Sequence, residues 1–75
     1  MNIVEQAIER HGSQAIVAEK LSQLTGHEYK QPHVAYWKRV GGFPAEIAGV
    51  VASGLFDHEI SAFDASPKIK RAVAK

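Results

Sequence analysis

Glycine and proline divide the chain into short amphipathic segments, and this division predicts an all-helical fold. In residues 2–11 and 14–24, apolar side chains recur every three or four positions, which places them on one face of a helix. Asn2 and Ser13 are suited to cap these two helices, and a glycine follows each segment where a left-handed C-cap is expected. No stretch shows the strict alternation of a half-buried strand.

Three further helices are expected along the rest of the chain. The first covers about 32–39 with Gln31 as its N-cap, and the second covers about 44–53. The last begins at Asp57, which we expect to cap it, and ends near Phe63. The sequence therefore predicts five helices.

Length and composition limit the classes of protein that this chain can belong to. Its 75 residues make one domain, and a hydrophobic content of 45% is enough for a core. Without cysteine it has no disulfide and no thiolate metal site, which fits a reducing cytoplasm. No apolar run approaches the length of a membrane span, and the acidic amphipathic N-terminus is unlike a signal peptide.

Charge is distributed unevenly although the net charge is only +1. Residues 29–43 contain Lys30, Lys38 and Arg39 but no carboxylate, and residues 65–75 contain four cations and no acid. Local patches without acids suit contact with phosphate. We divide the chain into one folded domain, 1–64, and a basic C-terminal tail, 65–75, for which a solvated, frayed end is the alternative.

The segment from Gln31 to Arg39 is the candidate functional element. Val34 and Trp37 share its apolar face, while His33 and Tyr36 lie with Gln31 on the polar face. A short helix packed on one side and polar on the other is what reading the major groove requires. An ordinary amphipathic surface helix is the alternative.

Three motifs in order resemble the Cro-like helix-turn-helix repressors of temperate phages, and especially their YdaS-type branch. They are GSQAIVAEKL, QPHVAYWKR and GGFPAEIAGVV, and the resemblance covers roughly residues 12–64. It implies a small five-helix bundle of the lambda-repressor-like, Cro-type, helix-turn-helix kind. One departure is that Ser22, not glycine, follows Leu21, and the loop before Val34 is longer than in the family.

The resemblance also assigns roles by position. Base contacts would come from the start and outer face of the second helix of the motif: Lys30, Gln31, Pro32, His33, Ala35 and Tyr36. Phosphate contacts would come from Ser13, Gln14, Lys38 and Arg39. Gln31 is the strongest candidate base reader, because a side-chain amide pairs bidentately with adenine. Ser13 has a simpler alternative as a helix cap only.

These expectations describe a transcriptional repressor that binds a palindromic double-stranded DNA operator as a homodimer in the bacterial cytoplasm, without a cofactor. The alternative is a protein–protein interaction module on the same fold, such as an antitoxin with a toxin partner. We do not expect an enzyme or a metal site. The four histidines are scattered without a cysteine, and no serine has the setting of a nucleophile.

Overall fold

The computed structural model describes residues 2–66, and within this range the chain is all-helical, without a strand. The all-α prediction is therefore confirmed. The elements in chain order are α1 (Ile3–His11), α2 (Gln14–Thr25), α3 (Gln31–Val40), the 3₁₀ turn η1 (Ala45–Ile47), α4 (Ala48–Val50), the π-wound turn η2 (Val51–Leu55) and α5 (Ala62–Ala65).

Helices α1 and α2 begin where their capping residues predict. The Asn2 side chain accepts the Glu5 N–H at 2.9 Å, and the Glu5 carboxylate accepts the Asn2 N–H at 2.9 Å, which completes a capping box. Ser13 Oγ accepts the Ile16 N–H at 3.2 Å at the start of α2. Gly12 ends α1 with a φ of +116°, a conformation that favours glycine. Both predicted helices are confirmed.

The start of α3 differs by one residue from the prediction. Lys30, not Gln31, is the N-cap residue, and Gln31 is the first residue of the helix. A lysine side chain has no acceptor, so the cap comes from His33, whose Nδ1 accepts the Lys30 N–H at 3.0 Å. Pro32 stays in the first turn, where its missing N–H leaves no helix bond unmade.

The helix expected over 44–53 is present as one helical segment whose winding changes from 3₁₀ through α to π across η1, α4 and η2. We had expected the helix to end at Gly54, but Gly54 lies inside this segment. A Cβ at Gly54 would lie 2.5 Å from Cδ1 of Leu24, so glycine allows the C-terminal part of α2 to lie against η2. Leu55 and Phe56 are buried, as predicted.

The prediction that Asp57 caps a helix ending near Phe63 is wrong. Asp57 and His58 form a turn with φ values of +52° and +65°, and α5 begins later, capped by Ser61. Aspartate and histidine adopt positive φ more readily than most residues, and the guanidinium of Arg10 also binds the Asp57 carboxylate at 3.2 Å. The carboxylate that was expected to cap a local helix is thus bound to α1.

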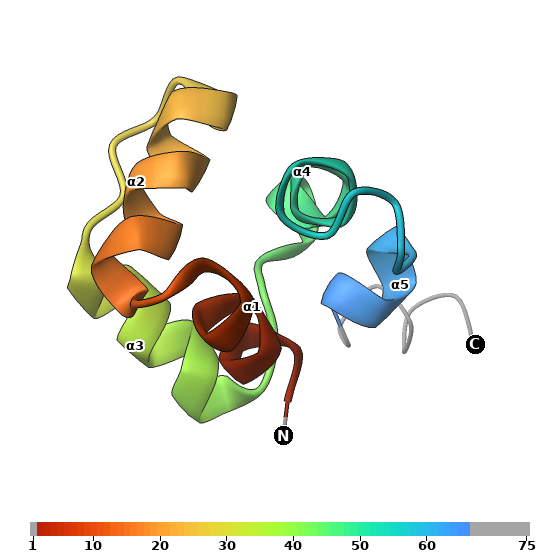
Figure 1. The fold of residues 1–75 in the computed structure, drawn as a ribbon, viewed down its shortest axis with the longest axis horizontal. Helices are drawn as coiled ribbons and strands as arrows, with labels where there is room; N and C mark the ends of the chain where they lie inside the picture. Colours follow the sequence, from red (N-terminus) through yellow and green to blue (C-terminus); the bar gives the residue numbers. More distant parts are fainter. Residues whose placement is uncertain (1, 67–75) are drawn as a thin grey trace.

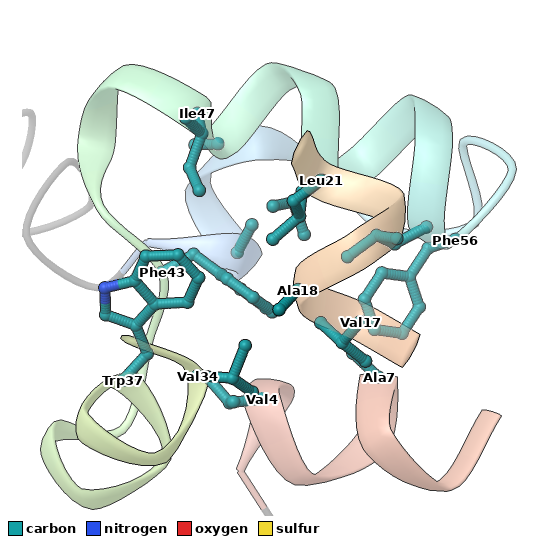
Figure 2. Close-up of a cluster of buried hydrophobic side chains, with 14 residues drawn as sticks. Val4, Ala7, Val17, Ala18, Leu21, Val34, Trp37, Phe43, Ile47 and Phe56 are labelled. Atoms are coloured by element: carbon teal, nitrogen blue, oxygen red, sulfur yellow. The ribbon is translucent and has the colours of Figure 1, made fainter. Parts of the chain in front are cut away.

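One apolar core joins all of these elements (Figure 2). Its centre contains Leu21 of α2, with the small Ala18 beside it on the same buried side of the helix. Ala15 and Leu24, which the sequence pattern placed on that side, are exposed. The buried residues of the cluster are Val4, Ala7, Val17, Ala18, Leu21, Val34, Trp37, Phe43, Ile47, Ala48, Val51, Leu55, Phe56 and Ala65.

The first three helices contact one another and form one group, while α4 and α5 pack together beside it (Figure 1). Contacts of α2 with η2 and of α1 with α5 join the two groups. The Phe43 N–H donates to the carbonyl of Ala65 at 2.9 Å, and both Ala65 and Ser66 are buried. These two residues, which we had assigned to the tail, therefore pack with the domain. Positions 67–75 of the predicted tail lie outside the described residues.

Candidate nucleic-acid interface

Helices α2 and α3 pack against each other and are joined by the loop 26–30. Val34 and Trp37 face the core and are almost fully buried, as the sequence predicts. The opposite side of α3 is exposed and consists of Gln31, Pro32, His33, Ala35, Tyr36, Lys38 and Arg39. We call this set the α3 outer face. It is an exposed surface of polar, charged and small apolar side chains together with Tyr36, and Val34 and Trp37 anchor it to the core.

The Ser22 hydroxyl fixes the loop between the two helices. It accepts the Tyr29 N–H at 2.8 Å and lies within hydrogen-bonding distance of the carbonyls of Ala18, at 2.8 Å, and Tyr29, at 3.2 Å. The Tyr29 ring packs on Trp37 with a centroid distance of 5.3 Å. In the sequence, Ser22 was noted only as a departure from the expected glycine, and its role in fixing the loop was not predicted. The signal available in the sequence was the hydroxyl group at this position.

The side chains of Gln14 and Gln31 bring the N-termini of α2 and α3 together. Nε2 of Gln31 donates to Oε1 of Gln14 at 3.4 Å. Gln31 keeps its second N–H and its carbonyl oxygen, which are the donor and acceptor that adenine requires. Gln14 keeps its amide N–H groups, which can donate to a phosphate oxygen. The two residues predicted for base and phosphate contact are therefore adjacent and hydrogen-bonded to each other.

Ser13 is occupied as a helix cap through its acceptor. Its oxygen accepts the Ile16 N–H, and toward a phosphate oxygen Ser13 has one hydroxyl hydrogen to donate. The backbone N–H groups of Gln14 and Ala15 are in the first turn, where a helix offers no internal acceptor. A phosphate at this end of α2 would therefore be bound through backbone N–H groups and Gln14 more than through Ser13.

Two predicted base-contacting residues already have partners in the structure. His33 accepts from the Lys30 backbone, and its ring lies against Tyr29, at a centroid distance of 5.6 Å. The Lys30 ammonium lies 3.1 Å from the carboxylate of Glu28, at the border of the acid-free stretch. Both members of that pair are exposed, so it contributes little and can exchange for a phosphate. His33 is the residue whose base contact the structure makes least accessible.

The C-terminal part of the α3 outer face carries positive charge. Arg39 places its guanidinium carbon 5.5 Å from the centre of the Tyr36 ring. Lys38 is exposed, and its carbonyl accepts from Nδ2 of Asn2 at 2.9 Å, which ties the end of α3 to α1. Within residues 2–66 neither cation is paired with a carboxylate. Their charges face solvent.

No protein-family model matches the chain, and comparisons with curated proteins and with solved structures found no significant match. The assignment of a function therefore depends on the geometry of α2 and α3 and on the motifs of the sequence.

The part of the chain that the structure describes gives no support for a metal site or a membrane-spanning helix. No three His, Asp or Glu side chains come together there in a way that could hold a metal ion. None of its helices is both long and apolar enough to cross a membrane. The α3 outer face, with the start of α2 beside it, is the candidate site.

Proposed function

We propose that the chain is a sequence-specific double-stranded DNA-binding transcriptional regulator in which α2 and α3 form a helix-turn-helix. The hydrogen bond between Gln14 and Gln31 is the observation that carries this proposal. A base-reading amide needs a defined orientation, and the Gln14 amide at the start of the neighbouring helix gives Gln31 one hydrogen-bond partner, at 3.4 Å. The same contact places a phosphate-binding group beside a base-reading group, which is the division of contacts that this motif uses.

In this proposal α3 enters the major groove with its N-terminus leading, and α2 crosses the backbone. Gln31 reads an adenine through its free N–H and carbonyl. Pro32 and Ala35, both exposed, contact thymine methyl groups. Gln14 and the first backbone N–H groups of α2 bind one phosphate, and Lys38 with Arg39 binds phosphates at the other end of α3.

The proposed domain is a lambda-repressor-like, Cro-type bundle of five helices, in which η1, α4 and η2 together count as the fourth. A domain of 75 residues presents a single reading helix and contacts too few base pairs to select one site in a genome. We therefore propose a homodimer on a palindromic operator, with half-sites about one helical turn apart. Repression follows from blocking polymerase, requires no cofactor, and takes place in the cytoplasm of a bacterial host.

A protein–protein interaction module, such as an antitoxin that binds a toxin, is the second candidate. Tyr36 and Val40 favour it, because these large apolar side chains of α3 are 53% and 54% exposed. Exposed aromatic and aliphatic groups on one helix are typical of partner-binding surfaces.

Selection of bound sequences from a pool of random duplexes separates the two candidates. The regulator should enrich a palindrome whose half-sites lie about ten base pairs apart. Its affinity should fall by orders of magnitude between about 50 and 200 mM salt, because phosphate contacts release counterions. A failure to bind any duplex at low salt would favour the interaction module.

A further inference from the structure

Tyr36 and Arg39 lie three positions apart on α3, so that their side chains occupy the same side of the helix. The guanidinium carbon of Arg39 is 5.5 Å from the ring centre of Tyr36, which is the geometry of a cation–π contact. Both side chains are exposed. The contact therefore lies on the surface that the proposed function directs at DNA, and it contributes nothing to the core.

We infer that Tyr36 is a positioning residue for Arg39, and that it does not itself read a base. This inference rests on the proposed function, since it assigns a role within the same DNA-binding face. The aromatic ring holds the guanidinium and limits its rotation. Within residues 2–66 no carboxylate pairs with Arg39, so its N–H groups are available to a ligand. They form the two-pronged donor that a phosphate group accepts bidentately.

The position of Arg39 along α3 identifies phosphate as its partner. Arg39 is the ninth residue of the ten-residue helix, so it lies about 12 Å along the axis from the first residue, at 1.5 Å per residue. The major groove is about 12 Å wide. A helix that enters the groove by its N-terminus therefore carries Arg39 at the groove edge, where the backbone lies. Lys38 stands beside it, and Asn2 fixes this end of the helix through the Lys38 carbonyl.

The alternative is that the Tyr36 hydroxyl or ring contacts a base directly. In that case the Tyr36 contact depends on sequence and is independent of Arg39. In the positioning role, the effect of Tyr36 is the same on every duplex and exists only while Arg39 is present. Ring and hydroxyl can be separated, because Tyr36→Phe keeps the aromatic face and removes only the hydroxyl.

Fluorescence anisotropy with a selected operator and an unrelated duplex of equal length tests the inference. The variants are Tyr36→Phe, Tyr36→Leu and Tyr36→Gln, each alone and combined with Arg39→Ala, with Lys38→Ala as the matched control background. Circular dichroism confirms that each variant is folded. Two ring-removing variants are used, so that loss of folding in one leaves the other available.

We expect Tyr36→Phe to bind both duplexes as the unmodified chain does. Tyr36→Leu and Tyr36→Gln should weaken binding to both duplexes about two- to fivefold, the worth of an exposed cation–π contact. In the Arg39→Ala background they should have no further effect, whereas in the Lys38→Ala background the loss should persist. Arg39→Ala should also reduce the slope of log affinity against log salt by about 0.9, the loss of one phosphate contact.

Two results would overturn the inference while leaving the proposed function standing. One is a loss of operator binding in Tyr36→Phe with unrelated duplex unaffected. The other is an equal effect of Tyr36→Leu with and without Arg39. If the unmodified chain binds no duplex at all, both the proposed function and the inference fall.

Discussion

At the scale of single residues, the Ser22 hydroxyl fixes the loop that leads into α3. One hydroxyl has one donor and two acceptor positions, and here it satisfies the Tyr29 N–H while donating to a backbone carbonyl. Ser22 thereby ties the loop 26–30 to α2, and α3 packs on α2 beyond this loop.

Ser22→Ala should destabilise the domain by about 1–3 kcal/mol, because it leaves the partly buried Tyr29 N–H without its acceptor. Urea unfolding followed by circular dichroism measures this loss. Ser53→Ala is the matched control, since its exposed hydroxyl bonds only carbonyls of its own helical segment, and its effect should stay within about 0.5 kcal/mol. Equal effects of the two substitutions would contradict the role of the Ser22 hydroxyl in fixing the loop.

At the scale of elements, ion pairs and a hydrogen bond join the C-terminal end of α1 to the segment that precedes α5. Arg10 binds Glu59 at 2.8 Å and Asp57 at 3.2 Å, and its guanidinium lies 5.6 Å from the ring centre of Phe56. Nε2 of His11 donates to the Leu55 carbonyl at 2.8 Å. These contacts hold the positive-φ turn at Asp57 and His58, which are two of the non-glycine residue types found most often at positive φ.

The ion pairs of Arg10 with Asp57 and Glu59 should make part of the stability of the fold depend on pH. The hydrogen bond from Arg10, with its positive charge, lowers the pKa of the Glu59 carboxyl below its ordinary value of 4.5. A carboxyl whose pKa is lower in the folded state stabilises the fold above its ordinary pKa, and this stabilisation is lost as the pH falls through the lowered pKa. The difference in thermal midpoint between the unmodified chain and Arg10→Ala should therefore be larger at pH 7 than at pH 2.

Lys20→Ala, which removes an exposed cation from α2, is the control for this comparison. It should change the thermal midpoint little at either pH. A difference between the unmodified chain and Arg10→Ala that is the same at both pH values would show that Arg10 acts through packing on Phe56 and not through its carboxylate partners.

The contacts of Arg10 also show which parts of the fold can be predicted from the sequence and which cannot. The ends of α1 and α2 follow from capping residues and glycines a few positions apart, and the periodic apolar residues place Val34 and Trp37 in the core. The turn at Asp57 depends on Arg10, which lies 47 positions away. A contact at that separation leaves no local pattern. The local signal was the tolerance of Asp57 and His58 for positive φ, and because it was interpreted as a helix cap the fifth helix was predicted too early.

For the candidate site, too, the sequence predicted some features and not others. The periodicity of α3 predicted which side is exposed, but not which side chains on it already have partners. His33, which was predicted to contact a base, also caps its own helix, because its ring Nδ1 accepts the Lys30 N–H. Gln14 and Gln31 were predicted separately, and only the packing of α2 on α3 shows that they are hydrogen-bonded.

At the scale of the whole molecule, α3 is mounted on the core and not merely attached to the surface. Its Trp37 packs against Phe43, with ring centres 5.6 Å apart, and Phe43 is bonded in turn to the backbone of Ala65. Val34, completely buried, anchors the other turn of the helix. The outer face of α3 is therefore presented in one orientation, which a sequence-specific contact requires. Gln31 is exposed on this face, so its replacement leaves the buried anchors Val34 and Trp37 in place.

The most direct test of DNA recognition by α3 is the affinity of Gln31→Ala for the selected operator and for random duplex of equal length, at one salt concentration. We expect a loss of about 1–3 kcal/mol on the operator, equal to one bidentate base contact, and almost none on random duplex. Gln23→Ala, an exposed glutamine of α2, should change neither. Equal losses for Gln31→Ala on both duplexes would contradict the account.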